Sequence, residues 1–129
     1  MTDPSPVKNN SEAKDRAVQI AEVARSKHAD EVSVLLVSNL TTLADFFVFC
    51  SAESETQLRA IAEAVDDCLS KQGTLPMGVE GREAGNWILM DYNDVILHIF
   101  KKESRAFYDL DRLWGDAPKI VLPDLTETQ

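Results

Sequence analysis

Two pairs of aspartates could bind a metal ion and support chemistry on a phosphate. The pairs are Asp91 with Asp94 and Asp109 with Asp111. Convergent carboxylates can hold Mg²⁺ against a triphosphate, as nucleotidyl transfer requires. Asp109 and Asp111 lie in a predicted helix, where a two-residue step turns side chains roughly 200° apart. Asp91 and Asp94 could converge in a turn, but the chain has no Gly-Ser pair to begin a phosphate-facing helix, so we interpret them as turn residues.

One histidine and two cysteines are the other chemically active candidates. His98 lies in an apolar run with no second histidine, cysteine pair or carboxylate at metal-ligand spacing, so a core position and a partner contact are both open for it. Cys50 and Cys68 lie in apolar periodic segments and lack the paired spacing of a zinc or redox site. We predict two reduced core thiols, no metal, no cofactor and no enzymatic activity.

Size and charge limit the functional class. A chain of 129 residues is expected to form one domain with its own core. Its net charge of −9 is opposite to the basic field that nucleic-acid binders present to phosphates, which disfavours extensive RNA contact and favours a basic protein partner. No apolar run has the length of a membrane span, and residues 1–10 lack a signal or transit pattern, so we expect a cytoplasmic protein with no membrane contact.

Hydrophobic periodicity predicts an α/β fold with the order α-β-β-α-β-β-β-α. Short loops require antiparallel neighbours and a helical link permits a parallel pair, which together predict a mixed β-sheet flanked by helices. We predict a disordered tail at 1–10, a domain at 11–116 and a C-terminal tail, surface-bound or loose, at 117–129. The predicted helices are 11–27, one capped by Ser54 and ended by Gly73, and one from Glu103 or Ser104 to Gly115 that buries Phe107, Leu110, Leu113 and Trp114. The predicted strands are 31–38, 45–51, 75–79, 87–90 and 95–100.

Charge predicts the register of the hairpin formed by the last two strands. A turn at Tyr92 and Asn93 would place Asp91 opposite Asp94, and like charges in a cross-strand pair are unfavourable. A four-residue connection from Asp91 to Asp94 avoids this and pairs Met90 with Val95. It also pairs Ile88 with Leu97, and it places Trp87 near His98 on the other face. Trp87 itself fits two roles, a core residue or a partner anchor, because tryptophan concentrates binding energy at interface centres.

The order of unlike residues resembles one family over nearly the whole predicted domain. Val79 to Trp114 reads VEGREAGNWILMDYNDVILHIFKKESRAFYDLDRLW, which contains EG, W-x-x-x-D-Y, V-x-x-H-x-F and S-R-x-x-Y-x-L-x-x-L-W. Together with SNLTTLADFFVFCSAESETQL upstream, this pattern resembles the ribosomal silencing factor family, also called Iojap-like. The resemblance implies a sheet with helices packed on it and a topology related to nucleotidyltransferases.

The resemblance also implies a function and a binding surface. The family binds ribosomal protein fourteen of the large ribosomal subunit and sterically blocks joining of the two subunits, which represses translation. Free protein is expected as a monomer or a homodimer, and the sequence leaves both open. The residues expected to bind the partner are Trp87, Met90, Asp91, Tyr92, Lys102, Arg105 and Tyr108.

Overall fold

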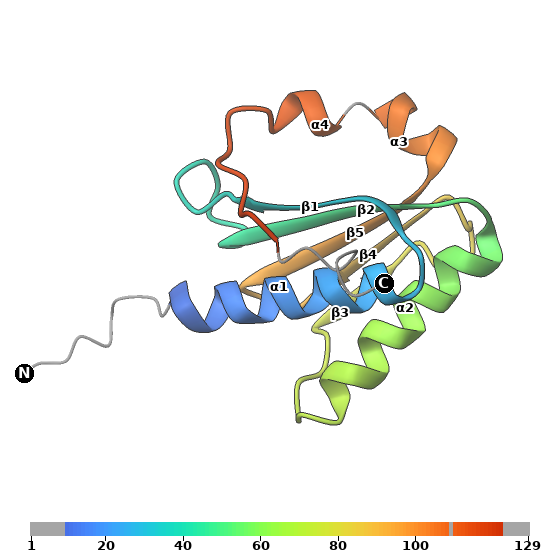
Figure 1. Cartoon of the computed structure of the whole chain (residues 1–129), viewed down its shortest axis with the longest axis horizontal. Coiled ribbons are helices and arrows are strands. Elements are labelled where there is room, and N and C mark those ends of the chain that lie inside the picture. The colour runs from blue at the N-terminus through green and yellow to red at the C-terminus, as the bar shows by residue number, and fades with distance from the viewer. Residues whose placement is uncertain (1–9, 109, 123–129) are drawn as a thin grey trace, which may run out of the picture.

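The computed structural model describes residues 10–108 and 110–122, which form a five-stranded mixed β-sheet with helices on both faces (Figure 1). This confirms the predicted class, a single α/β domain. The elements in chain order are α1 (Asn10–Ser26), β1 (Asp30–Leu36), β2 (Phe46–Ala52), α2 (Glu55–Ser70), β3 (Gly78–Glu80), β4 (Trp87–Asp91), β5 (Val95–Lys101), α3 (Lys102–Tyr108) and α4 (Leu110–Leu113).

The strands are ordered β1-β2-β5-β4-β3 across the sheet. β2 and β5 are parallel, and the other neighbours are antiparallel. β2 lies between β1 and β5 and is buried over its whole length, as expected for a strand covered on both faces. β3 has only three residues and forms one edge of the sheet, next to β4.

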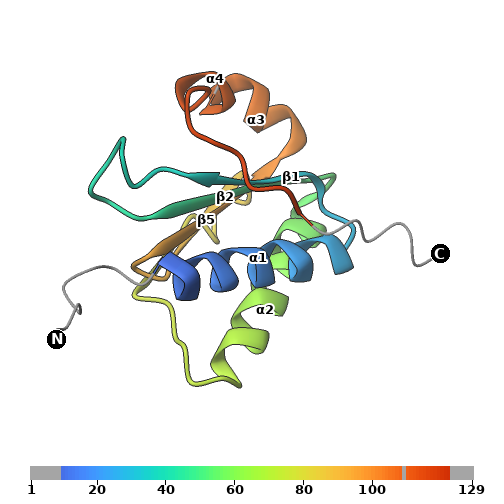
Figure 2. The same ribbon diagram turned by 60° about the vertical axis from the view of Figure 1, so that its left-hand side comes forward.

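Helices α1 and α2 pack on one face of the sheet (Figure 2). The start of α2 follows from its sequence, because the side chain of Ser54 accepts a hydrogen bond from the backbone of Gln57 and so satisfies a free amide of the first turn. An apolar stripe on α2 then turns inward. Its buried members are Leu58, Ile61, Ala62, Val65 and Leu69.

The opposite face of the sheet is aromatic. Phe47 and Phe49 of β2 and Phe100 of β5 point to this side and form a second core cluster. The two helices α3 and α4 lie over it (Figures 1 and 2). Trp114, just after α4, packs edge-on against Phe47 with ring centroids 4.8 Å apart. The sheet therefore separates an aliphatic core from an aromatic one.

The hairpin of β4 and β5 differs from the predicted register by two residues. Met90 pairs with Leu97 rather than Val95, and Ile88 pairs with Ile99 rather than Leu97. The backbone amide of Tyr92 donates to the carbonyl of Val95, which leaves a two-residue turn. The prediction rested on repulsion between Asp91 and Asp94. In the structure the turn consists of Asn93 and Asp94, so Asp91 pairs with Ile96 and does not lie opposite Asp94. The carboxylate of Asp94 pairs instead with Arg16 of α1.

Other predicted elements are close to those observed, with three differences. The strand predicted at 75–79 begins later, at Gly78, and the last helical region ends at Leu113 rather than at Gly115. Leu113 was predicted to be buried but is 69% exposed, whereas Trp114 is half-buried, as predicted. The side chains of Phe107 and Leu110 lie outside the described residues.

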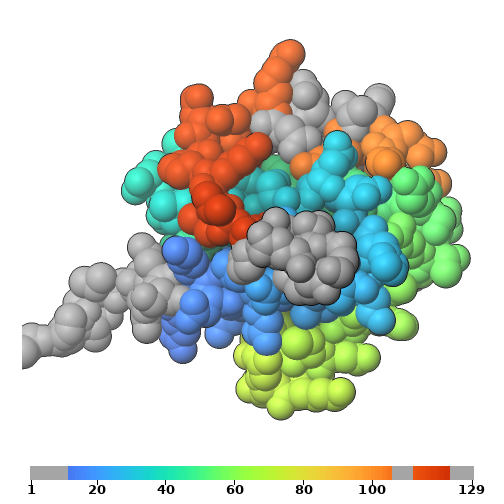
Figure 3. Space-filling view, viewed as in Figure 1, coloured from blue at the N-terminus to red at the C-terminus, as the bar shows by residue number. Residues whose placement is uncertain are grey.

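The segment after α4 returns along β1. The amide of Leu36 donates to the carbonyl of Pro118, and the amide of Ile120 donates to the carbonyl of Val34. Figure 3 shows this segment in red, lying between the atoms of β1 and those of α1. Of the two states predicted for the C-terminal tail, residues 118–120 take the surface-bound one.

Candidate partner-binding surface

Strand β4 places three of its residues on the aromatic side of the sheet. Successive side chains of a strand point to opposite faces, so Trp87, Leu89 and Asp91 share one face while Ile88 and Met90 share the other. The first three are half-buried, and Ile88 and Met90 are completely buried against the helices. Trp87, Leu89 and Asp91 form the outer row, which is accessible to a partner.

A cluster of rings supports Trp87 from below. Its indole stacks on the ring of Phe100 at 5.3 Å and on the imidazole of His98 at 6.0 Å. His98 also contacts Phe47 and Phe49 edge-on, with ring centroids 5.0 Å away in each case. Trp87 is thus held against a rigid aromatic layer while part of its surface stays accessible.

His98 is a neutral member of this layer. Its side chain is 7% exposed, and neither ring nitrogen has a hydrogen-bond partner among the described residues. Burial lowers the pKa of the imidazole to about 4, because a charged ring would lose its hydration. Of the two roles open at the sequence level, the structure favours the core role.

A small hollow lies beside Trp87 at the β3 side of the sheet. It has a volume of about 170 Å³, a mostly apolar lining, and walls formed by Glu80, Gly81, Trp87 and Leu89. Gly81 has a φ of +90°, and a Cβ atom there would lie 1.9 Å from the carbonyl oxygen of Trp87. Only glycine lets the chain pass this close to the start of β4.

The loop between β3 and β4 is fastened to α2. The guanidinium of Arg59 donates to the carbonyl of Arg82 through Nε at 3.1 Å and through Nη2 at 2.8 Å, and to the carbonyl of Glu83 at 3.3 Å. The end of the loop is held as well, because the amide of Lys101 donates to the carbonyl of Asn86 at 2.9 Å. The surface around Trp87 therefore rests on anchored backbone.

Met90 and Tyr92 occupy different positions from those expected of contact residues. Met90 is completely buried on the α1 and α2 side, and Tyr92 is buried in the same core. Burial, followed by the charge of Asp66 on α2, raises the pKa of the Tyr92 phenol to about 12. Neither side chain offers a partner surface in this structure, which corrects their expected role as direct contacts.

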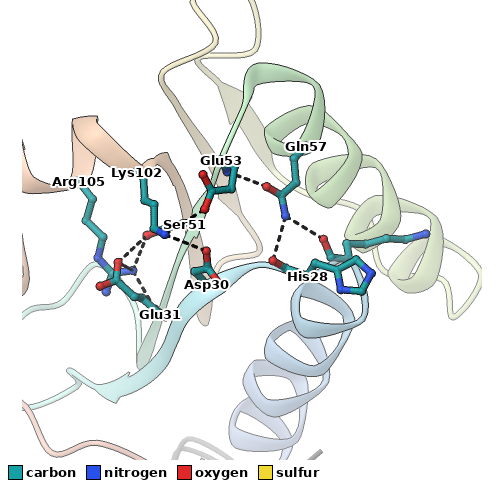
Figure 4. Close-up of polar contacts among 9 residues, drawn as sticks. His28, Asp30, Glu31, Ser51, Glu53, Gln57, Lys102 and Arg105 are labelled. Carbon is teal, nitrogen blue, oxygen red and sulfur yellow. Dashed lines mark hydrogen bonds and ion pairs between the residues drawn. The ribbon is translucent and has the colours of Figure 1, made fainter. Parts of the chain in front are cut away.

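Lys102 and Arg105 tie the start of α3 to the ends of β1 and β2 (Figure 4). Nη1 of Arg105 donates to the carbonyl of Glu31 at 2.8 Å and to Oγ of Ser51 at 2.9 Å. Because Arg105 is only 7% exposed, its observed role is internal. Lys102 is exposed and pairs with Glu53 and Asp30, and hydrogen bonds to these carboxylates raise its pKa.

The remaining candidate residues do not come together at one site among the described residues. Tyr108 ends α3, but its side chain lies outside the described residues, as do Asp109 and the side chain of Asp111. Oδ1 of Asp91 accepts from the amide of Asn93 at 2.7 Å, while Asp94 pairs with Arg16. Within 10–108 and 110–122, no group of three or more histidine, cysteine or acidic side chains is placed to hold a metal ion, and no helix is long and apolar enough to span a bilayer.

Four residues of this surface were missed by the sequence analysis: Glu80, Gly81, Leu89 and Arg59. Leu89 could have been predicted from strand alternation, because it lies two residues after Trp87 and so shares its face. Glu80 pairs with Leu89 across the strands, and this neighbour could be identified only once the register of β3 against β4 was known. Nothing in the local sequence signals that Arg59 reaches the loop.

The fold and this surface define a class of protein: a small α/β domain whose outer row on β4, which contains Trp87, is half-buried beside a preformed hollow. Comparison with known proteins specifies the family. The family model described as "Ribosomal silencing factor during starvation" matches residues 10–129. The chain therefore belongs to the ribosomal silencing factor family.

Individual relatives agree with this membership. The chain is 41% identical over 96 residues to "Ribosomal silencing factor RsfS" of Halalkalibacterium halodurans, which spans 74% of this chain and 82% of the relative. It is 34% identical over 113 residues to "Protein Iojap, chloroplastic" of Zea mays, covering 88% of this chain and 49% of that protein. A crystal structure of a Bacillus halodurans protein superposes with a TM-score of 0.73 at 34% identity, covering 84% of this chain and 99% of the other.

Proposed function

We propose that this protein represses translation by occupying the large ribosomal subunit. In this proposal it binds ribosomal protein fourteen through the outer row of β4 and sterically prevents the small subunit from joining. Family membership supports a role in ribosome silencing. The partner and the joining block are inferences that rest on the resemblance and on the surface described above.

The observation that carries the proposal is the placement of Trp87. Its ring is half-buried on an aromatic layer, and interfaces draw most of their binding energy from a few well-packed aromatic residues. The anchored loop and the rigid strands mean that little order has to be gained on binding, which favours affinity. Of the residues expected to touch the partner, we retain Trp87, Asp91, Lys102 and Tyr108, add Leu89, and assign Met90, Tyr92 and Arg105 to support.

The charge of the chain favours a protein contact over an RNA contact. A net charge of −9 is attracted to a basic ribosomal protein and repelled by phosphates. The mechanism needs no catalysis, cofactor or metal, and we propose that it operates in the cytoplasm. The open β3 edge and the outer row would also allow two copies to associate when no subunit is present, which sedimentation equilibrium of the free protein would measure.

Co-sedimentation with purified subunits tests the proposal. The protein should pellet with large subunits and remain in the supernatant with small subunits. Equal recovery with both subunits would contradict selective binding. A nucleotide-turnover assay with magnesium on the same preparation separates this account from an enzymatic one, for which continuous nucleotide consumption is the signature.

A further inference from the structure

We propose that the hollow bounded by Glu80, Gly81, Trp87 and Leu89 receives one apolar side chain of the ribosomal protein, and that Glu80 contacts a basic residue next to it. The inference rests on the proposed function and adds the chemistry of recognition. It specifies a side chain of leucine or methionine size beside a lysine or arginine.

The size and lining of the hollow suit such a group. Its volume is about 170 Å³, and its lining is mostly apolar. A dry protein cavity of roughly 150 Å³ binds benzene, so a side chain of leucine or methionine size matches the available space. Water in a hollow of this kind would gain few hydrogen bonds, and an apolar side chain that displaces it gains the hydrophobic contribution.

The hollow is preformed. On one side Gly81 packs against the backbone of Trp87 with no room for a Cβ atom. The same loop is clamped to α2 by Arg59, and Gly85 packs against the side chain of Glu55, where a Cβ atom would lie 2.8 Å from Cδ. A site that is already shaped loses little conformational entropy when it is filled.

One residue at the rim of the hollow, Glu80, is acidic, which points to the occupant. Glu80 is exposed and pairs with Leu89 across the strands. Asp91 lies two residues further along the same face of β4. An apolar side chain on a basic segment matches both parts of the hollow, because the apolar group fits the interior and the basic residue contacts the rim. The net charge of −9 adds long-range attraction. The hollow also adjoins Trp87, the centre of the proposed interface.

Filling the hollow tests the inference. Leu89→Trp places a large ring at the wall of the hollow, whereas Met77→Trp adds the same ring on the same edge at a position that is 71% exposed and outside the hollow. Equilibrium affinity for purified large subunits should fall about tenfold or more for Leu89→Trp and stay unchanged for Met77→Trp. Wild-type affinity in a folded Leu89→Trp variant would overturn the inference.

A second matched pair of variants tests the contact assigned to Glu80, and it can be measured even if Leu89→Trp fails to fold. Glu80→Arg and Glu63→Arg change the net charge equally, but Glu63 lies on the exposed side of α2. Glu80→Arg should weaken binding at least about fivefold more than Glu63→Arg. Equal losses would show a general charge effect and would overturn the contact assigned to Glu80.

A probe of the free protein separates this inference from the proposed function. N-acetyl-leucine amide, titrated in place of the ribosomal protein, should shift the NMR signal of the Trp87 indole, and N-acetyl-glycine amide should not. Trp114 provides the internal reference. If the protein binds no large subunit but the leucine probe shifts Trp87, the proposed function fails while the apolar side-chain site stands. If neither probe shifts Trp87, the hollow takes no such side chain and the inference fails.

Discussion

The charge state of His98 is set by its surroundings rather than by its own chemistry. Four rings surround the imidazole, and burial lowers its pKa from 6.5 to about 4. In the unfolded chain the ring binds a proton near its ordinary pKa, so between these two values the unfolded state holds more protons than the folded state. Stability therefore rises with pH through this window and is lost as pH falls through it.

His98→Phe should remove this part of the pH dependence. From about pH 7 to about pH 4.5, the wild-type protein should lose up to about 3 kcal/mol more unfolding free energy than the variant. Urea unfolding followed by circular dichroism at both pH values measures the difference, and the carboxylates shared by the two proteins cancel. Parallel losses in the two proteins would mean that the imidazole is charged in the folded state.

Asp91 serves the hairpin turn and, in our proposal, the partner. Its Oδ1 accepts a hydrogen bond from the amide of Asn93, whose φ of +77° asparagine tolerates better than most residues. Asp91→Asn keeps an oxygen for the turn and removes the charge, so the fold should persist while affinity for the large subunit drops by roughly 1 kcal/mol and becomes less dependent on salt. Affinity measured at two salt concentrations tests this.

Asp94→Asn is the control for the same charge change. It weakens the ion pair with Arg16 that links α1 to the turn, so it should lower the unfolding free energy and leave the affinity of the folded protein near the wild-type value. If Asp91→Asn binds as tightly as the wild type, Asp91 has no part in the interface. The sequence analysis interpreted both aspartates as turn residues, and in the structure the side chain of Asp91 bonds to the turn backbone while that of Asp94 pairs with Arg16.

At the scale of elements, α2 carries two separable functions on its two sides. Ile61 lies in the buried stripe. Arg59 lies outside that stripe and holds the loop before β4. Ile61→Ala should lower the unfolding free energy by about 2–5 kcal/mol, as other buried truncations do, without changing the affinity of the folded protein. Denaturant unfolding measures this.

Arg59→Met should do the opposite. It removes the hydrogen bonds to the carbonyls of Arg82 and Glu83, and because Arg59 is partly exposed the stability loss should stay below about 1 kcal/mol. Amide hydrogen exchange in the loop should accelerate, and affinity for the large subunit should fall several-fold as the wall beside Trp87 loosens. Unchanged exchange in the loop would show that Arg59 does not hold it.

Local patterns predicted the elements well because each is specified by nearby residues. The stripe and the Ser54 cap define α2, and an unbroken apolar run defines β2. The hairpin register was missed because the turn begins one residue later than the two-residue turn that was considered. It consists of Asn93 and Asp94, and Asn93 adopts a φ of +77°. Leu113 was misplaced because helical spacing identifies an apolar stripe but not whether another element covers it.

The candidate site was predictable only in part, for a related reason. Its residue type indicated Trp87 as a candidate anchor, and the resemblance added the residues that follow it as one stretch. A strand presents alternate residues to opposite faces, so Met90 and Tyr92 could not share the surface of Trp87 and Asp91. The internal role of Arg105 depends on Glu31 and Ser51, which only the folded chain brings to it.

At the scale of the whole molecule, the fold combines an acidic exterior with one rigid aromatic face. The aliphatic core under α1 and α2 stabilises the sheet, and the aromatic layer under Trp87 gives β4 a firm backing. The proposed repression then follows from size and position, because a bound domain excludes the small subunit without any chemical step. The central claim of this proposal is that a protein bound to the large subunit through Trp87 prevents the small subunit from joining.

A subunit-joining assay tests this claim most directly. Light scattering follows the association of purified subunits after the large subunit has been incubated with the wild-type protein or with Trp87→Ala, whose fold is checked by circular dichroism. We predict that the wild type blocks joining, and that Trp87→Ala requires a much higher concentration because its binding is roughly 2–4 kcal/mol weaker. Joining at the normal rate and extent with saturating wild-type protein, or equal inhibition by the two proteins, would contradict the account.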